Sequence, residues 1–375
     1  MKNTRIAVVS TPTLERWDWR APARGIGGSE TSHVVMAQRL KAAGFDVVSF
    51  APLPEVFFPD PTGLEWRDSA DFSPAEFQVV INYRDPKVFE APKPEGAKWW
   101  FVAQDVDYPW TPEALAKVDR YLCLCKEHAR YARRKYPELH NSGRLFISSN
   151  GILSDEIQAE IDGIERNPHR LMYASSPDRG LMLLLEQWFR IRERVPEAEL
   201  HVFYGFHNME KIVAANGPDD WRAGYQRKLE GLLKQPGVVW HDRVGQRDLW
   251  KEWAKTSVFW YPTDFPETSC ISIMEAQACG AIPVTSNFWA AGENCLSPYV
   301  YPGLPQQSAV VRQLQVERVV DLLRNSAGDK VSVAHPESPR EMMQRAARER
   351  FNWSNVVAQW GKWIEEDLKD ASCVG

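Results

Sequence analysis

Two glutamates, Glu267 and Glu275, stand eight positions apart in the run YPTDFPETSCISIMEAQACGAIPVTS. The first stands in a loop after an expected strand. The second lies about two turns into the following helix, whose start Thr268 and Ser269 can cap. A helix N-terminus offers free backbone N–H groups and the positive end of the helix dipole, so it suits a diphosphate or sugar hydroxyls. The two carboxylates can then bind the two ends of an elongated polyhydroxyl ligand; the alternative is a pair of unrelated surface glutamates.

Glycines open another expected helix in the turn Gly27-Gly28-Ser29-Glu30, which follows the first strand. Because glycine has no side chain, the backbone of such a turn can approach an anion closely, and the helix end that follows stabilises the anion. The turn differs from the dinucleotide-binding pattern G-x-G-x-x-G, since it follows a long loop and lacks the third glycine. It is a second candidate for binding phosphate.

Arg179, Asp105 and Asn150 each follow an expected strand. A guanidinium such as that of Arg179 can bind two phosphate oxygens at once. Asp105 and Asp107 imitate a metal-binding Asp-x-Asp pattern, but no histidine or aspartate partner accompanies them at a suitable spacing, so no metal site is predicted. The plainer interpretations are an exposed helix start for Arg179 and turns at Asp107 and Asn150.

The elements that would position these residues alternate between strands and helices along the whole chain. Short apolar, β-branched runs predict buried parallel strands, and apolar residues three and four apart predict helices. The alternation occurs twice, which predicts an α/β protein with helices on both faces of two parallel sheets. The expected strands lie at 5–10, 46–50, 78–82, 99–103, 121–125 and 145–149 in the first half and at 171–174, 199–204, 238–241, 258–261 and 281–285 in the second.

Two domains are expected, because 375 residues exceed the usual size of a single hydrophobic core. The first domain is expected at residues 1–153, a turn-rich linker at 154–170 and the second domain at 171–352. The remaining residues, 353–375, carry apolar side chains on one side and predict an amphipathic helix.

The residues around the second glutamate complete a known pattern. Glu267, Glu275 and the run Ala276-Gln277-Ala278-Cys279-Gly280-Ala281-Ile282-Pro283-Val284 resemble the signature of the family-4 retaining glycosyltransferases of GT-B fold, which is E-x7-E, a small-residue helix, Cys-Gly and a proline-bearing strand. The resemblance implies two Rossmann-like domains whose parallel sheets face each other across a cleft. It also implies an acceptor-binding first domain, a nucleotide-sugar-binding second domain and a final helix that crosses back to the first domain.

The resemblance also implies roles for individual residues. Glu275 would hold the ribose of the donor, and Glu267 would hold hydroxyls of the transferred sugar. The backbone between them would meet the sugar and the phosphates. The glycine turn at 27–29 would reach the donor phosphates and the acceptor, and Arg179 would neutralise the diphosphate leaving group.

Several positions depart from the family pattern. Thr268 and Cys270 stand where the family usually has glycines. Gln104 stands in the place of a histidine before Asp105, and serines at 175 and 176 replace an arginine upstream of Arg179. With Asn150, which lies where the family carries Asn-Gly, Gln104 and Asp105 would still contact hydroxyls of the acceptor or sugar.

The activity implied by the resemblance is transfer of a sugar from a nucleoside diphosphate to an acceptor hydroxyl, with retention at the anomeric carbon. The reaction would use no metal ion and no cofactor besides the nucleotide-sugar donor. The expected acceptor is a glycan or a lipid-linked saccharide. Three alternatives stay open: transfer to hydroxymethylated pyrimidines in DNA, a nucleotide-sugar epimerase, and a nucleotide-sugar-binding protein without catalysis.

Composition and charge indicate which partners and which cellular compartment to expect. A net charge of −5 argues against a protein that generally coats nucleic acid. The basic helix expected at 127–136 is either a solvated face or a contact for anionic headgroups or nucleic acid. Six cysteines without zinc-ligand spacing favour buried thiols in a reducing cytosol. Since no apolar stretch approaches the ~20 residues of a membrane span and no leader pattern is seen, we expect a cytoplasmic protein with at most peripheral membrane contact.

Overall fold

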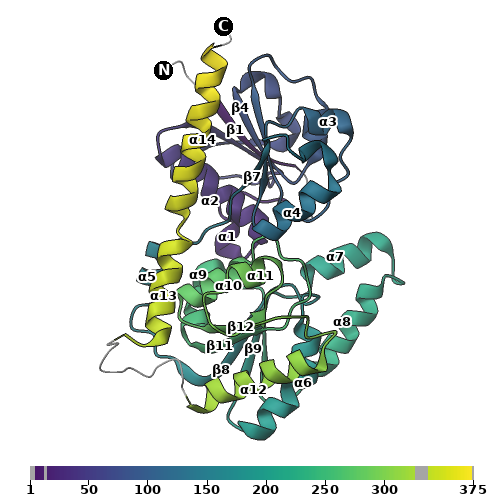
Figure 1. Cartoon of the computed structure of the whole chain (residues 1–375), viewed down its shortest axis with the longest axis vertical. Helices are drawn as coiled ribbons and strands as arrows, with labels where there is room; N and C mark the ends of the chain where they lie inside the picture. Colours follow the sequence, from purple (N-terminus) through teal and green to yellow (C-terminus); the bar gives the residue numbers. More distant parts are fainter. Residues whose placement is uncertain (1–4, 12–14, 326–336, 374–375) are drawn as a thin grey trace. The chain divides into compact units, whose positions relative to one another are not determined.

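The computed structural model describes residues 5–11, 15–325 and 337–373 (Figure 1). The chain divides into two compact units, and each is built around one parallel sheet. Unit 1 comprises Met1–Pro22, Ile26–Gly151 and Trp353–Gly375, whereas unit 2 comprises Ala23–Gly25 and Ile152–Asn352. The last helix of the chain therefore belongs to the same unit as the first strand.

Among the described residues, unit 1 has a seven-stranded parallel sheet with the order β3-β2-β1-β4-β5-β6-β7. In the centre of the sheet, Val8 of β1 is in register with Ser49 of β2 on one side and Ile81 of β4 on the other. The strands are β1 Arg5–Ser10, β2 Asp46–Ala51, β3 Glu65–Asp68, β4 Val79–Tyr83, β5 Lys98–Val102, β6 Arg120–Cys123 and β7 Leu145–Ile147. The helices are α1 Ala21–Arg24, whose second half lies in unit 2, α2 Gly28–Ala42, α3 Pro112–Ala116, α4 Lys126–Lys135 and α14 Trp353–Cys373, with short 3₁₀ turns η1 Ser69–Asp71, η2 Pro74–Glu76, η3 Pro86–Glu90 and η4 Pro137–Leu139.

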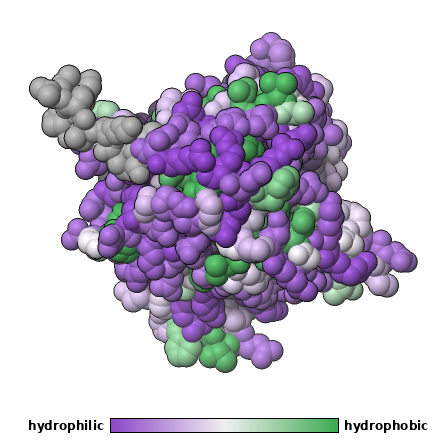
Figure 2. Space-filling view, turned by 90° about the horizontal axis from the view of Figure 1, so that it is seen from below, coloured by the Kyte–Doolittle hydropathy of each residue, from purple (hydrophilic) through white to green (hydrophobic). Residues whose placement is uncertain are grey.

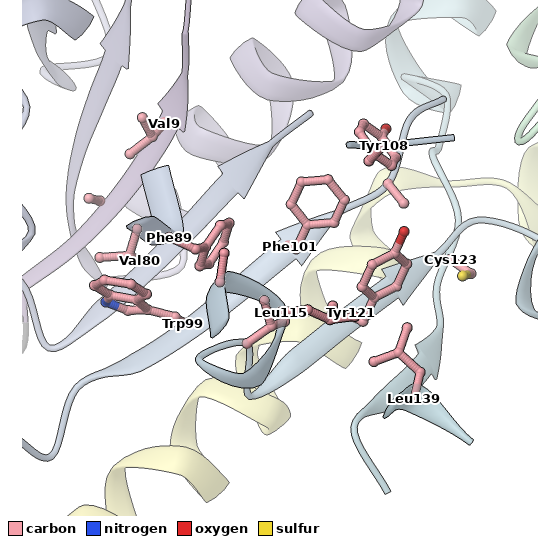
Figure 3. Packing of buried hydrophobic residues seen from close by; sticks show 14 of the residues in the cluster. Val9, Val80, Phe89, Trp99, Phe101, Tyr108, Leu115, Tyr121, Cys123 and Leu139 are labelled. Carbon is pink, nitrogen blue, oxygen red and sulfur yellow. The ribbon is translucent and has the colours of Figure 1, made fainter. Parts of the chain in front are cut away.

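Aromatic side chains fill one face of this sheet (Figure 3). The ring of Phe101 meets the rings of Tyr108 and Trp110 edge to face, with centroids 4.7 Å apart in both pairs. Such edge-to-face pairs add to the free energy gained by burying the rings. Tyr108 lies in the loop that follows β5, so the aromatic core fixes the position of that loop at the carboxyl end of the sheet.

The C-terminal helix α14 is attached to unit 1 by buried polar contacts as well as apolar ones. The carboxylate of Asp367 accepts hydrogen bonds from the indole Nε1–H of Trp100 at 2.7 Å and from the guanidinium of Arg120. Trp360 of the same helix donates from its indole to Ser148 Oγ at 2.8 Å. Because Trp100 and Arg120 lie on β5 and β6, the helix is held against this part of the sheet of unit 1.

The described part of unit 2 has a six-stranded parallel sheet with the order β10-β9-β8-β11-β12-β13. The strands are β8 Asn167–Ala174, β9 Glu199–Phe203, β10 Val238–Asp242, β11 Thr256–Tyr261, β12 Ile282–Ser286 and β13 Val300–Tyr301. The helices are α5 Ser154–Ile161, α6 Leu181–Arg194, α7 His207–Asn216, α8 Trp221–Leu232, α9 Gln246–Ala254, α10 Ile271–Ala278, α11 Trp289–Glu293, α12 Ala309–Asn325 and α13 Pro339–Arg350.

Helices cover both faces of the second sheet. Helices α6 and α12 pack together against it, and α9 and α10 form another pair that packs against β11 and β12 (Figure 1). Strand β11 is fully buried along its length, as a central parallel strand between two helical layers must be. The predicted fold class, α/β with two parallel sheets, is confirmed.

The segment expected to be a linker is more ordered than its composition indicates. Residues Ser154–Ile161 form helix α5, which packs on α9 and buries Ile157 and Ile161. Strand β8 begins at Asn167, four residues before the expected start, because its first residues pair with β11 at Thr256. The chain thus passes from unit 1 into unit 2 without a long flexible connection between Gly151 and Asn167.

Figure 2 shows the distribution of polar and apolar residues on one face of the molecule. On the face shown in Figure 2, hydrophilic residues predominate and hydrophobic ones lie in small separate groups. None of the helices that the structure describes is both long and apolar enough to cross a membrane.

Candidate functional site

The candidate residues of unit 2 lie at the carboxyl end of its sheet, where ligands of open α/β folds bind. Arg179 follows β8, and Glu267 lies in the loop between β11 and α10. Both strands are central and adjacent in the sheet, so the loops that leave them meet. Gly180 makes this approach feasible, because a Cβ built there would lie 2.6 Å from the backbone oxygen of Pro262.

Arg179 and Glu267 form an ion pair in which the carboxylate is buried and the arginine half-buried. Nη1 of Arg179 lies 3.1 Å from Oε1 and 3.0 Å from Oε2 of Glu267. Burial lowers the pKa of Arg179, but the neighbouring Glu267 and other anionic groups raise it more, so the guanidinium stays charged. The ring of Phe265 lies under the guanidinium, 4.1 Å from its central carbon. The buried Nε–H of Arg179 has no partner among the described residues, so a donor remains for an anion.

Tyr261 fixes the carboxylate of Glu267 from the other side. Its hydroxyl donates to Oε1 of Glu267 at 2.5 Å, and Ser175 Oγ lies 3.0 Å from the same hydroxyl oxygen. Tyr261 is the last residue of β11 and is completely buried. The loop residue Glu267 is therefore held by side chains from both β11 and the turn after β8.

The start of helix α10 differs from the expected one. The hydroxyls of Thr268 and Ser269 were expected to cap this helix, but Cys270 is the residue before its first turn, and no side chain caps it. Cys270 has a left-handed backbone, with φ 51° and ψ 60°, where the family has a glycine. This turn directs the chain so that Ser269 Oγ is buried with no hydrogen-bond partner among the described residues. The first backbone N–H groups of α10 are thus not used by side-chain caps.

Glu275 lies inside helix α10 and is almost entirely buried, with 4% of its surface exposed. Its Oε1 accepts hydrogen bonds from Trp250 Nε1 at 2.8 Å and Gln246 Nε2 at 2.9 Å, both from helix α9. Burial raises the pKa of Glu275 to about 7, and these two hydrogen bonds only partly oppose the change. Both of these donors bind the same oxygen, Oε1.

The candidate residues of unit 1 form a separate set at the carboxyl end of the first sheet. Asn150 and Gln104 exchange two hydrogen bonds of 3.1 Å between their amides, and Ser32 Oγ donates to Asn150 Oδ1 at 2.8 Å. All three side chains are buried. They join the ends of β5 and β7 to helix α2, so Gln104 and Asn150 belong to one fixed polar network.

Arg84 connects Asp105 to Glu30, which follows the glycine turn. Gly27 precedes α2, and a Cβ built on it would lie 2.5 Å from Oε2 of Glu30. Glu30 Oε1 accepts from Nη1 of Arg84 at 3.3 Å, and Asp105 Oδ2 accepts from Nε of the same guanidinium at 2.7 Å. The sequence-predicted residues Gly27, Gly28, Ser29 and Asp105 thus lie around one charged cluster.

Other sequence features have a structural explanation. In the basic helix α4, Tyr131 donates to Asp107 at 2.7 Å, and Lys135 lies 3.6 Å from the same carboxylate. His128 of this helix is buried, and burial lowers its pKa to about 4, so the imidazole is neutral near pH 7.

Five residues of the two sets were not found from the sequence. Arg84 and Tyr261 stand at the carboxyl ends of strands β4 and β11, which is a usable signal for a ligand-facing position. Nothing in the sequence links Trp250 and Gln246 of α9 to Glu275, or Ser32 of α2 to Asn150, because these contacts depend on how helices pack. The five residues are Arg84, Tyr261, Trp250, Gln246 and Ser32.

Known proteins match this chain in structure but not in sequence. No protein-family model and no curated protein matches the sequence. Among solved structures, the chain is similar to a sucrose-phosphate synthase from Thermosynechococcus elongatus, with 14% identity over 98% of this chain and 100% of that one and a TM-score of 0.68. It is also similar to a glycosyltransferase from Rickettsia africae, with 12% identity, 98% and 100% coverage and a TM-score of 0.71.

A third similar structure contains ligands. It is HepE from Anabaena in complex with UDP and glucose, with 11% identity over 97% of this chain and 100% of that one and a TM-score of 0.65. These likenesses extend over nearly the whole chain and confirm the predicted GT-B fold with its two Rossmann-like domains.

Proposed function

We propose that this protein is a glycosyltransferase that moves a sugar from a nucleoside-diphosphate sugar to an acceptor hydroxyl. The observation that carries the proposal is the ion pair of half-buried Arg179 with buried Glu267 beside the uncapped start of α10. It supplies positive charge and a sugar-binding carboxylate at the carboxyl end of a sheet. In the GT-B fold, which HepE shares, such a position suits a nucleotide sugar; the HepE structure contains UDP and glucose.

The unpaired donor of Arg179 supports a role at the diphosphate. Only Nη1 of its guanidinium is bound to Glu267, and the buried Nε–H lacks a partner among the described residues. A diphosphate would satisfy that donor and share the positive charge with Glu267. The backbone of Thr268, Ser269 and Cys270 would add N–H groups at the helix start.

We propose that Glu267 and Glu275 bind opposite ends of the donor. Glu267 would accept hydrogen bonds from hydroxyls of the transferred sugar, and Glu275 would bind the ribose through the oxygen that Trp250 and Gln246 do not use. In unit 1, Gln104, Asp105, Asn150 and the turn Gly27-Gly28-Ser29 would bind the acceptor and the phosphates.

The proposed mechanism retains the anomeric configuration. The acceptor hydroxyl attacks on the face from which the diphosphate leaves, the glycosidic C–O bond forms as the C–O bond to phosphate breaks, and a phosphate oxygen takes the proton. The chain would contribute positioning and stabilisation of the charge that develops on the diphosphate. Arg179 and the start of α10 supply that charge stabilisation, so the proposal includes no metal ion.

The test begins with the donor. UDP-, GDP- and ADP-sugars are each titrated by calorimetry and incubated to detect slow hydrolysis, and the anomeric configuration of any product is read by NMR. We expect one nucleotide class to bind and to be hydrolysed. Binding without any turnover would support a binding protein, and a new sugar nucleotide without release of nucleoside diphosphate would support an epimerase.

The acceptor is then tested with the active donor. We propose a glycan or lipid-linked saccharide and expect transfer to an oligosaccharide or to a saccharide on a short lipid. Duplex DNA containing hydroxymethylated pyrimidines is included in the same assay. Transfer to that DNA alone would overturn the proposed acceptor class while leaving the donor chemistry in place.

Tyr261→Phe tests the support of Glu267. The change removes the hydroxyl that donates to Glu267 Oε1 at 2.5 Å and leaves the ring. We expect kcat for transfer to fall about tenfold, since a carboxylate that loses one charge-assisted hydrogen bond is less well positioned. Tyr173→Phe is the matched control: its ring is also buried in this sheet, but its hydroxyl donates to the backbone oxygen of Ser176. An equal loss in both variants would contradict the specific role of Tyr261.

A further inference from the structure

Arg84 connects two parts of unit 1 that the proposed acceptor site requires. It directly follows β4, between the glycine turn before α2 and the Asp105 loop after β5. Its Nε donates to Asp105 Oδ2 at 2.7 Å, and its Nη1 lies 3.3 Å from Glu30 Oε1. One guanidinium thus binds a carboxylate from each of the two segments.

The backbone of Arg84 adopts a conformation that side chains other than glycine rarely take. Its φ is 73°, in the left-handed region, and its N–H points to the carbonyl of Val102 in β5 at 3.4 Å. Such a conformation is strained for an L-residue and persists where the surrounding contacts require it. Here it turns the side chain at the strand end toward both carboxylates.

The two carboxylates differ in their surroundings. Glu30 is buried, which raises its pKa, and Arg84 opposes this change. The side chain of Asp105 is 48% exposed, and its backbone N–H donates to the hydroxyl of Tyr108 at 2.6 Å. Glu30 and Tyr108 are the fixed parts of the cluster, and Asp105 is the group that a ligand can reach.

We propose that Arg84 is a positioning residue that orients the carboxylate of Asp105 toward the acceptor hydroxyl. Glu30 holds the guanidinium in place from the glycine turn, and the guanidinium in turn fixes the exposed carboxylate. A charged, planar group with several N–H donors suits this bridging role better than an ammonium. The inference rests on the proposed function, because it assigns Asp105 to acceptor binding.

The experiment is a double-mutant cycle on the full chain with Arg84→Gln, Asp105→Asn and the combined variant. We expect each single change to lower kcat for transfer about 30-fold and the double variant to lose no more than either one. The donor Kd from calorimetry should stay within about twofold in all three variants, because neither Arg84 nor Asp105 is assigned to donor binding. Arg84→Lys should recover part of kcat, since it keeps the charge but cannot bridge both carboxylates in the same way.

Arg67→Gln is the matched control. Arg67 also bridges two carboxylates in unit 1, with Nε 2.7 Å from Glu65 and Nη1 3.0 Å from Glu76, but it lies on the edge strand β3. We expect its kcat to stay at the wild-type value. Thermal unfolding of every variant shows whether a loss of activity reflects damage to the fold; if Arg84→Gln does not fold, the cycle is run with Arg84→Lys.

The outcomes distinguish a failure of the role proposed for Arg84 from a failure of the proposed function. Effects that multiply in the double variant, or an unchanged kcat in Arg84→Gln, overturn the role of Arg84. Equal losses in the Arg84 and Arg67 variants do the same. If the wild-type protein neither binds nor hydrolyses any of the nucleotide sugars, the proposed function itself fails.

Discussion

Replacing Arg179 with glutamine is expected to lower kcat for sugar transfer about 1,000-fold, because its guanidinium is the positive charge that we assign to the proposed diphosphate. Two contacts with the buried carboxylate of Glu267 already hold this half-buried guanidinium in place. The measurement is release of nucleoside diphosphate at saturating donor and acceptor. Arg179→Lys should lose about 10- to 100-fold, since it keeps the charge but not the planar group of donors.

Stability must be followed in parallel, because Arg179→Gln leaves the carboxylate of Glu267 buried without its cation. Breaking a buried pair in this way can destabilise a protein by several kcal/mol, on the order of 3–5 in fully buried cases. The matched control is Arg194→Gln at the end of α6, where the arginine pairs with Glu317 on the surface. If folded Arg179→Gln and Arg179→Lys both kept kcat within about threefold of wild type, the assignment of Arg179 to the leaving group would be wrong.

Replacing Glu275 with glutamine is expected to weaken donor binding about 100-fold at pH 8. The reason is that the variant loses one or two charge-assisted hydrogen bonds to the ribose. The amide oxygen can keep the contacts with Trp250 and Gln246, so the packing of α9 on α10 is preserved. Calorimetric titration with the active nucleotide sugar measures the Kd. A Kd within about threefold of wild type would contradict the ribose-binding role.

The same variant should be more stable than wild type in alkaline solution. The pKa of Glu275 is raised from 4.5 to about 7 by burial. Below pH 4.5 the carboxyl is protonated in both folded and unfolded states, so it does not change stability. As pH rises to about 7, only the unfolded state ionises fully, and wild type loses about 3 kcal/mol of unfolding free energy that the glutamine variant keeps.

Glu252→Gln provides a control of opposite sign. Burial would raise the pKa of Glu252, but hydrogen bonds and charge from Lys255 and Arg170 outweigh it and lower the pKa. Its ionised form therefore stabilises the folded state above pH 4.5, and its glutamine variant should lose stability there while binding donor normally. Thermal unfolding at pH 5 and pH 8 distinguishes the two cases; the assigned burial of Glu275 would be contradicted if its variant gained nothing at pH 8.

The central strands of both sheets and the edge strands β7 and β10 could be predicted from the sequence, whereas the edge strands β3 and β13 could not. Strands β1, β4 and β11 are continuous apolar runs because both of their faces are covered. Strand β3, Glu65–Asp68, is a short polar edge strand, and only its pairing with β2 defines it. The sequence of helix α5 is typical of a polar linker. Its two isoleucines are buried because α5 packs on α9, and the local sequence does not show this contact.

The positions of site candidates could be predicted where the residues are close in sequence. The sequence predicts Glu267 before and Glu275 within one helix, and in the structure both side chains are buried around α10; their ligand-binding role stays a prediction. The contacts that hold them come from distant positions: Arg179 is 88 residues from Glu267, and Trp250 is 25 residues from Glu275. Arg84 and Glu30 are 54 residues apart. Such pairs depend on strand order and helix packing, which local spacing does not encode.

The placement of α14 in unit 1 affects how the chain matures on the ribosome. The helix is synthesised after all of unit 2, yet it supplies Asp367 to Arg120 and Trp100 in unit 1. Unit 2 lies between, and its backbone closes near its own ends, where Ile152 donates to the carbonyl of Phe351. The nascent chain can therefore complete unit 2 while the first sheet still exposes an unpaired guanidinium and indole to solvent. Unit 1 can therefore complete its core only after the whole of unit 2 has been synthesised.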